Sequence, residues 1–431
     1  MEIGIYFKFI LSFALILLAA RLGGELFERY LKQPPVLGEL VAGIVISPFA
    51  LGGLINDPVI LNFAMIPGAF GLHEFSVMEV ISGIAVVALL FVAGVETDVR
   101  AFLKQGITGT LVAIGGVILP FALGYFITMW LAPGAGIAGW LFIGATLTAT
   151  SIGVTVRILM EMGKLQTRAG TTILVGAVVD DIIGIVILSI VIGISSIAKV
   201  GGEVSIAHIS LDALRIAAIG FAVWFALLIV GVKFHKYISR FLLTPFKRSG
   251  TMPIFALIVG FLIAYLVTLV DLHPVVGAYV AGLMFAATAE REDILDKTRP
   301  IMLFLAPFFF CYLGMQVDTR LLWAGAVLAV ILIVAAIIGK MVGCYIPARF
   351  AGKMSHTEGM IVGIGMVPRG EVGLIIAGAG LLAGAVTRDL FGAAVAVSVI
   401  TTLVTPAMLK PFFKKQTETA GKREAPVQQE K

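Results

Sequence analysis

The run from Thr171 to Ile197 carries no charge except at two adjacent aspartates, Asp180 and Asp181. At about 1.5 Å per residue, a helix over this run is long enough to cross a lipid bilayer. Both carboxylates then lie near mid-depth, where each costs roughly 2.5–3.5 kcal/mol on the insertion scale. Ionisable residues at this depth point by default to an ion or proton pathway.

The composition indicates that membrane-spanning segments occur along the whole chain, and not only in this run. Apolar residues make up 59% and charged residues only 13%, whereas soluble domains are roughly 25% charged. Uncharged runs of spanning length recur throughout, so the predicted fold class is an all-α polytopic membrane protein. We interpret the net charge of +5 as a product of membrane topology, and we expect no nucleic-acid partner. Cys311 and Cys344 lie in apolar runs and predict neither a disulfide nor a metal centre.

The hydropathy pattern predicts about thirteen transmembrane helices. Their expected ranges are Ile5–Phe27, Pro35–Leu51, Met78–Ala93, Ile107–Leu131, Gly136–Met160, Thr171–Ile197, Leu211–Val232, Met252–Val270, Val275–Ala287, Ile301–Met315, Leu322–Ile346, Glu358–Leu382 and Leu390–Phe412. Most basic residues, among them Arg157, then fall in loops on one side, which the positive-inside rule makes cytoplasmic. The opposite side carries only Lys8, Lys199, Arg215, Arg320 and Arg388. This asymmetry predicts a multi-pass protein of the cell (inner or plasma) membrane, with its N-terminus outside and its C-terminus cytoplasmic.

Two pairs of segments resemble each other in the same order along the chain. Residues 35–43 (PVLGELVAG) match 274–282 (PVVGAYVAG), and residues 90–98 (LFVAGVETD) resemble 311–318 (CYLGMQVD). An odd span between two six-helix units gives the second unit the opposite membrane orientation. We therefore predict two inverted-topology repeats, an architecture of secondary transporters, with chance similarity among glycine-rich helices as the alternative.

Two predicted spans, in equivalent places of the two copies, contain residues that favour a break. The first holds a polar cluster over 146–153 (TLTATSIG), and the second holds Pro-Arg-Gly-Glu within 365–373 (GMVPRGEVG). Proline removes a backbone donor and clashes with the preceding turn. We expect two broken, crossing helices whose ends present partial charges to a site. The residues concerned are Thr150, Ser151, Pro368, Arg369 and Glu371, of which Arg369 and Glu371 are expected to neutralise each other.

Lys340 lies well inside the span 322–346, too deep to reach the membrane surface. It requires an anionic partner, and Asp180 or Asp181 can supply one. Adjacent helical residues point about 100° apart, so one aspartate can pair with Lys340 while the other faces solvent. A purely structural pair is the alternative, although it leaves the second aspartate unexplained.

These motifs together resemble the monovalent cation–proton antiporter superfamily, and most nearly its NapA-like sodium/proton antiporters. The resemblance covers nearly all of 33–412 and rests on 149–153 (ATSIG), 178–181 (VVDD), 339–340 (GK) and 368–374 (PRGEVGL). It implies a homodimer whose subunits each have a core domain and a dimerisation domain. It also implies that Asp181 carries the cation and the proton, that Asp180 pairs with Lys340, and that Thr150 and Ser151 neighbour the ion.

The implied domain boundaries follow the order of the spans. We expect a dimerisation domain from 1–103 and 241–320, a core domain from 104–198 and 321–413, a connector helix over 199–240 and a disordered cytoplasmic tail over 414–431.

The expected function is secondary active exchange of cytoplasmic sodium for external protons by alternating access, not enzymatic catalysis. Sodium and protons would compete for the same carboxylates as transported species, and no resident cofactor is expected. Three ionisable groups (Asp180, Asp181 and Lys340) predict electrogenic exchange of two protons for one sodium ion. The alternatives are a Kef-like potassium/proton antiporter and a channel or sodium-coupled symporter of related fold. An intramembrane aspartyl protease would need Gly-x-Gly-Asp and Tyr-Asp motifs, which the sequence lacks.

Overall fold

The computed structural model describes residues 2–51, 65–66, 75–200, 206–247, 250–270, 272–317, 326–382 and 384–424. It is built from helices, with one two-stranded antiparallel pairing of β1 (Met65–Ile66) and β2 (Phe75–Ser76). The chain divides into two compact units, each assembled from separate stretches of sequence. Unit 1 comprises 1–99, 156–163 and 206–324, and unit 2 comprises 100–155, 164–205 and 325–431.

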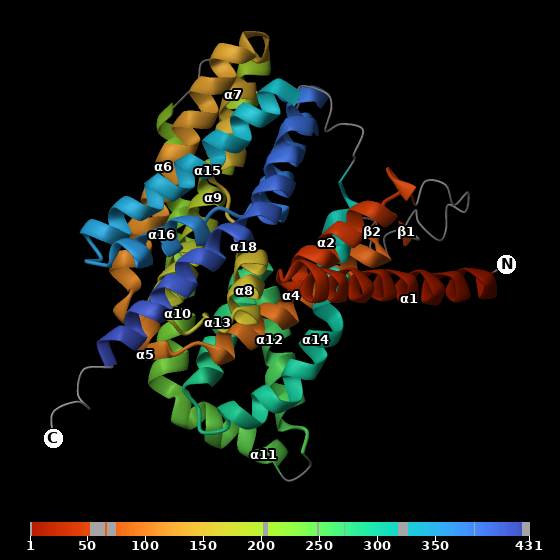
Figure 1. Ribbon diagram of the computed structural model, residues 1–431, viewed down its shortest axis with the longest axis vertical. Helices are drawn as coiled ribbons and strands as arrows, with labels where there is room; N and C mark the ends of the chain where they lie inside the picture. The colour runs from red at the N-terminus through yellow and green to blue at the C-terminus, as the bar shows by residue number, and fades with distance from the viewer. Residues whose placement is uncertain are drawn as a thin grey trace. The chain divides into compact units, whose positions relative to one another are not determined.

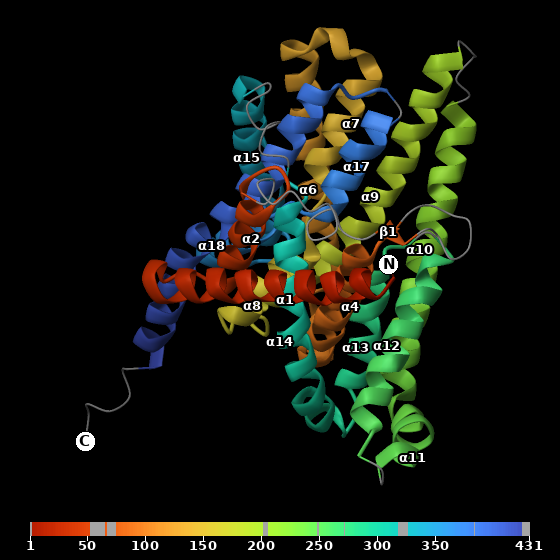
Figure 2. The ribbon, with the colours of Figure 1, turned by 90° about the vertical axis from the view of Figure 1, so that its right-hand side faces the viewer.

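Unit 1 combines helices from the first 99 residues with helices from 206–324, in the middle of the chain (Figures 1 and 2). Proline occupies the first turns of α2, α12 and α13, where its missing N–H costs nothing. Its helices are α1 (Glu2–Leu26), η1 (Phe27–Leu31), α2 (Pro35–Ile46), α4 (Val77–Glu96), α10 (Ile206–Tyr237), η4 (Ile238–Leu243), α11 (Thr244–Lys247), α12 (Met252–Thr268), α13 (Pro274–Ala286) and α14 (Arg291–Met315).

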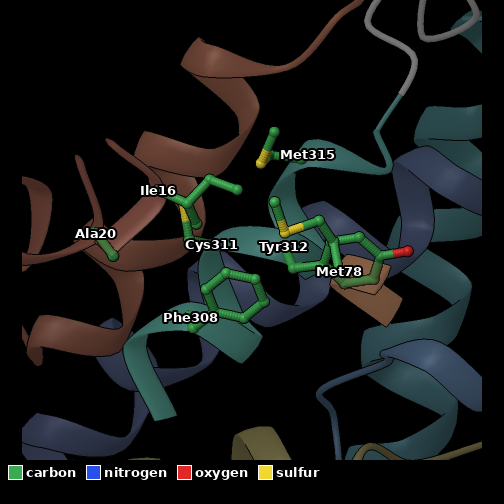
Figure 3. Packing of buried hydrophobic residues seen from close by; sticks show 7 residues of the cluster. All are labelled: Ile16, Ala20, Met78, Phe308, Cys311, Tyr312 and Met315. Carbon is green, nitrogen blue, oxygen red and sulfur yellow. The ribbon is translucent and has the colours of Figure 1, made fainter. Parts of the chain in front are cut away.

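An apolar cluster of α1, α4 and α14 forms part of the core of unit 1 (Figure 3). Ile16 and Ala20 on one face of α1 meet Phe308 and Cys311 of α14, with Met78, Tyr312 and Met315 completing the cluster. The spacing of four residues on α1 places both side chains on the same face of that helix. This face of α1 packs against α14.

Unit 2 contains the stretch with the two aspartates and the last hundred or so residues. Its helices are α5 (Val99–Lys104, of which Val99 belongs to unit 1), α6 (Gly106–Leu131), η3 (Pro133–Ala135), α7 (Gly136–Thr148), α8 (Ile152–Glu161, which begins in unit 2 and ends in unit 1), α9 (Arg168–Val200), α15 (Ala326–Phe350), α16 (His356–Gly365), α17 (Glu371–Leu382) and α18 (Arg388–Glu424). Within this unit α6 packs against α7, α9 and α15 (Figure 1). A capping box starts α16, where Ser355 Oγ accepts from the Glu358 amide and Glu358 accepts from the Ser355 amide.

Eight helices among the described residues are long and apolar enough to cross a membrane, or nine if a pair over 217–246, bent by 50°, is one span. Four shorter apolar helices (35–46, 252–268, 274–286 and 372–381) coincide with further predicted spans. The protein is therefore a multi-pass helical membrane protein, while the count of thirteen stays a prediction. The predicted start of the span at Ile301 is ten residues late, because α14 already begins at Arg291 in a charged stretch.

Two further expectations are corrected by the helix bounds. Disorder from residue 414 is wrong for 414–424, because α18 continues to Glu424 through a segment rich in good helix formers; residues 425–431 lie outside the described part. Arg157 does not lie in a loop but inside α8, which restarts at Ile152 after the first break.

Two pairs of glycines make close, reciprocal helix contacts in unit 1. At Gly43 of α2 an added Cβ would lie 1.9 Å from the Cys311 carbonyl oxygen, and at Gly314 of α14 it would lie 2.1 Å from that of Leu40. Gly94 and Gly282 make the same reciprocal contact between α4 and α13, at 2.3 Å from the Tyr279 oxygen and 2.2 Å from the Phe91 oxygen.

In the sequence repeat, Gly43 corresponds to Gly282 and Gly94 corresponds to Gly314. Exchanging the two copies therefore turns the first contact into the second. This reciprocity supports the inverted repeat, which remains a proposal.

Candidate ion-binding site

Asp180 and Asp181 lie side by side on α9, and Lys340 faces Asp180 from α15. Lys340 Nζ donates to Asp180 Oδ1 at 2.9 Å, and the two side chains are 0% and 1% exposed. Asp181 is also buried, at 5% exposed. With all three groups ionised the trio carries one net negative charge, which its apolar surroundings disfavour unless a cation or proton neutralises it.

One oxygen of Asp180 stands out. Oδ2 is buried and has no hydrogen-bond partner in the structure, although Oδ1 of the same carboxylate accepts from Lys340. A buried acceptor left unsatisfied costs about 1–3 kcal/mol or more when charged. Carboxylate oxygens suit hard cations, so Asp180 Oδ2 and the neighbouring Asp181 can together hold a small cation.

The room for Lys340 is created by a glycine on α6. A Cβ added at Gly116 would lie 3.3 Å from Lys340 Nζ and 2.5 Å from Cys344 Sγ. A side chain at this position would overlap Cys344 Sγ and crowd the ammonium group of Lys340. Sequence reasoning missed Gly116 because its neighbours lie on α15, more than two hundred residues away.

The two expected helix breaks are present, at 149–151 between α7 and α8 and at 366–370 between α16 and α17. They are hydrogen-bonded to each other. The Ser151 amide donates to the Pro368 carbonyl at 2.9 Å, and Thr150 Oγ1 donates to the Met366 carbonyl at 3.2 Å. Thr155 Oγ1 adds a bond to Gly365 O at 3.1 Å, a contact that the sequence did not suggest. These bonds satisfy backbone groups that broken helices would leave unpaired.

Gly370 allows the breaks to come this close. A Cβ at this position would lie 2.4 Å from Ser151 Oγ and 2.7 Å from Ser151 Cβ. The sequence Pro-Arg-Gly-Glu therefore combines a residue that interrupts the helix with one that leaves space for the crossing segment.

Arg369 lies in the second break, and its side chain is 0% exposed. It donates to three backbone carbonyls, those of Val367, Leu147 at 2.6 Å and Ala336 at 3.3 Å. Leu147 is in the last turn of α7, where unpaired carbonyls carry the negative end of the helix dipole. Arg369 therefore neutralises the end of α7. The side chain of Glu371 lies outside the described part, so the expected Arg369–Glu371 pair stays a prediction.

The second break contacts both helices that carry the charged trio, α9 and α15. Met366 Cε lies 3.5 Å from where a Cβ would stand on Gly176, one turn before Asp180 on α9. The Arg369 contact to Ala336 lies one turn before Lys340 on α15. The residues expected to form the ion site thus occupy neighbouring turns of unit 2.

A second buried charge cluster, in unit 1, was not singled out from the sequence. Arg157 Nε donates to Glu161 Oε1 at 2.6 Å, and its NH2 lies 3.7 Å from Glu39 Oε1. Both glutamates stand near helix ends, where the sequence offers no sign that they are buried. A helical reading of 152–161 would have placed Arg157 and Glu161 one turn apart, but nothing in it points to Glu39.

Comparison with known proteins identifies the family of this chain. Residues 11–415 match the family model described as sodium/hydrogen exchanger, transmembrane. The high-affinity Na(+)/H(+) antiporter NhaS3 of Synechocystis is 35% identical, covering 97% of this chain and 91% of that protein. The Na(+)/H(+)-K(+) antiporter GerN of Bacillus cereus is 34% identical, covering 94% of this chain and 97% of that protein.

A solved structure is similar in fold. That of the sodium proton antiporter MjNhaP1 from Methanocaldococcus jannaschii at pH 8 superposes with a TM-score of 0.62 at 18% identity, covering 95% of this chain and all of that one. The family match over nearly the whole chain decides the classification. This chain belongs to the sodium/hydrogen exchanger family.

Proposed function

We propose that this protein is a secondary active sodium/proton antiporter in which Asp181 carries either a sodium ion or a proton. The observation that carries the proposal is the buried Asp180–Lys340 pair at 2.9 Å, adjacent to Asp181. The trio of Asp180, Asp181 and Lys340 comprises two carboxylates and one ammonium group, so its own charges leave it one positive charge short of neutrality. Either a proton or a sodium ion supplies that charge.

Competition for one charge explains why the two ions would exchange. An empty site carries a buried negative charge, which is costly to move through an apolar barrier. A proton or a sodium ion at Asp181 offsets this charge, so a loaded site can move at lower cost than an empty one. We propose that unit 2 moves relative to the membrane to expose the site to each side in turn, with cytoplasmic sodium leaving and external protons entering.

Lys340 gives the exchange its proposed stoichiometry. When sodium binds, Asp180 Oδ2 and Asp181 become its ligands, and the Asp180–Lys340 bond is weakened. A buried lysine that loses its anionic partner releases a proton more readily. We therefore propose electrogenic exchange of two protons for one sodium ion, in a homodimer whose N-termini lie outside the cell and C-termini inside.

The test is ion-dependent proton flux in proteoliposomes. A sodium gradient should drive proton movement in the opposite direction, sensed by a trapped pH dye. A membrane potential of 100 mV acts on one net charge with about 2.3 kcal/mol, so the rate should respond to an imposed potential. Absence of sodium-driven proton movement in active, correctly inserted protein would reject the proposal.

Potassium is a second candidate substrate, because the name of the relative GerN includes potassium. The same liposomes, given gradients of sodium, lithium or potassium of equal size, distinguish the cations. Proton flux driven by potassium alone would replace sodium as the proposed substrate and leave the exchange mechanism intact.

A further inference from the structure

The Glu39–Arg157–Glu161 cluster of unit 1 borders a cavity of about 550 Å³ whose lining residues all belong to that unit. Carboxylates outnumber cationic groups in this lining, with five glutamates against three arginines. The glutamates are Glu25, Glu28, Glu39, Glu96 and Glu161. Such an excess concentrates counter-ions in a cleft. An acidic lining alone does not define a binding site. The hydrogen bonds of the buried carboxylates show whether one of them can bind a ligand.

The bonding leaves one oxygen of Glu39 without a partner. Arg157 is buried and is shared by the two carboxylates, with its Nε at 2.6 Å from Glu161 and its NH2 at 3.7 Å from Glu39. Glu161 uses its other oxygen, Oε2, to accept from the Val36 amide at 3.4 Å. Glu39 is 1% exposed, and its Oε2 is buried with no hydrogen-bond partner. One guanidinium cannot neutralise two buried carboxylates.

The remaining arginines of the lining do not donate to the unpartnered oxygen of Glu39. Arg299 donates to Glu96, and Arg21, whose positive charge acts on Glu39, donates to the Leu303 carbonyl. Oε2 of Glu39 therefore remains available to a small positive ligand from outside the protein. Among the described residues, no group of three or more His, Cys, Asp or Glu side chains is placed to hold a metal ion. A strongly held divalent ion is therefore a poor fit, whereas a weakly held monovalent ion needs fewer carboxylates.

We propose that this cavity is a second monovalent-cation site, with Glu39 as its central ligand and Arg157 as the residue that positions it. The inference deepens the proposed function by adding a place where sodium is held apart from the aspartate pair. It predicts that sodium binding and sodium transport can be separated by mutation. Glu39 sets how much sodium is recruited, while Asp181 is required for exchange.

The direct test measures sodium binding after the aspartate site has been removed. In the Asp180→Asn/Asp181→Asn protein, calorimetric titration with sodium chloride, against choline chloride at equal ionic strength, should still show weak binding. Adding Glu39→Gln should abolish this residual signal, and Glu39→Asp, which keeps the charge, should restore part of it. Because exchange is not measured, this test stands or fails independently of the proposed antiport.

The matched control is Glu292→Gln. This glutamate is 73% exposed, pairs with Arg291 and is not part of the cavity lining. The Glu292→Gln substitution removes the same charge as Glu39→Gln and should leave the residual sodium binding unchanged. Heat denaturation of each variant, with and without sodium, verifies that it is folded.

Transport provides the second measurement. In otherwise wild-type protein, Glu39→Gln should raise the half-saturating sodium concentration about threefold, whereas Glu292→Gln should change it by less than about 1.5-fold. Two results would overturn the site: no residual sodium binding in the double aspartate variant, or residual binding that persists in folded protein after Glu39→Gln. The first would mean that a proton neutralises Glu39.

Discussion

Two buried clusters in this protein, one in each unit, have the same composition of charge and differ in almost everything else. Asp180, Asp181 and Lys340 comprise two carboxylates and one cation, as do Glu39, Glu161 and Arg157. In each, one carboxylate oxygen is buried without a hydrogen-bond partner: Oδ2 of Asp180 and Oε2 of Glu39. With its three groups ionised, each cluster carries one net negative charge, and a further arginine acts on each, Arg369 on Asp180 and Arg21 on Glu39.

The difference lies in the cation and in its supports. Lys340 is a compact point charge that bonds to one aspartate, so a competing ion can displace it. Arg157 has a planar group that bonds to Glu161, reaches toward Glu39 and donates to Met302 Sδ at 3.5 Å. A lysine in such a trio suits a site that changes its charge during a cycle. An arginine suits a site that keeps a fixed geometry while ions come and go.

The largest expected effect is on transport, which should require the aspartate cluster but not the glutamate cluster. Asp181→Asn removes the exchangeable charge but keeps the shape of the side chain, so sodium-driven proton flux should fall below about one hundredth of wild type. The measurement is dye-reported flux in proteoliposomes with equal amounts of inserted protein. Asp389→Asn, at an exposed position in the first turn of α18, is the control and should retain flux. Substantial flux in Asp181→Asn would remove the functional distinction between the two clusters.

The next effect concerns Lys340, the partner of Asp180. Lys340→Gln leaves Asp180 buried and unpaired, so the free energy of unfolding should fall by about 3–5 kcal/mol. The double variant Asp180→Asn/Lys340→Gln removes both charges and should recover much of that loss. Thermal unfolding in detergent measures both. If the double variant is no more stable than the single one, the effect is lost packing and not an uncompensated charge.

The same double variant tests the role of lysine in stoichiometry. Without Lys340 the site can exchange only one proton for one sodium ion. Currents on a solid-supported membrane should then vanish under a sodium jump while dye-reported proton exchange remains measurable. A wild-type current in this variant would show that the second proton comes from elsewhere.

A smaller effect should follow from the second helix break, which contacts the helices of the aspartate cluster. Pro368→Ala restores the amide and the helical preference at the second break, so α17 can extend toward α16 and disturb the bond from Ser151. Exchange should fall about tenfold, a loss of roughly 1.4 kcal/mol in transition-state stabilisation. Pro307→Ala, inside the unbroken helix α14, is the control and should preserve exchange. Equal losses in both variants would make the break irrelevant to the site.

The sequence reveals the aspartate cluster of unit 2 better than the glutamate cluster of unit 1, for a physical reason. Charges in the middle of an apolar run must be buried, so Asp180, Asp181 and Lys340 could be identified from the depth at which they lie. The breaks could be located because proline and glycine act on the local backbone. The interruptions at 149–151 and 366–370 are present where these arguments placed them. Depth alone left either aspartate as the partner of Lys340; the bond goes to Asp180, as the family resemblance implied.

Glu39, Arg157 and Glu161 gave no such signal. They lie near the ends of predicted spans, where charged side chains usually reach water, and their burial depends on contacts between α2 and the end of α8. The partners of Arg369 were equally hidden, because backbone carbonyls have no sequence signature. Arguments from local pattern therefore find groups that must be buried, but not groups that tertiary packing happens to bury.

The smallest predicted effect tests the geometric role of arginine directly. Arg157→Lys preserves the positive charge but replaces a planar group with a single ammonium, which cannot bond Glu161 while also facing Glu39 and Met302. The free energy of unfolding should fall by about 1 kcal/mol, the scale of one lost hydrogen bond. Apparent melting temperature in detergent is the measurement, in sodium and in choline.

Arg29→Lys is the matched control, because Arg29 pairs with Glu25 at 2.7 Å where both side chains are mostly exposed. Exposed pairs of this kind contribute little, so its melting temperature should be unchanged. If both substitutions are silent, Arg157 acts only as a charge, and a lysine could hold the second cluster as one holds the first. A loss confined to Arg157→Lys would show that fixed geometry, not charge alone, distinguishes the cluster of unit 1 from that of unit 2.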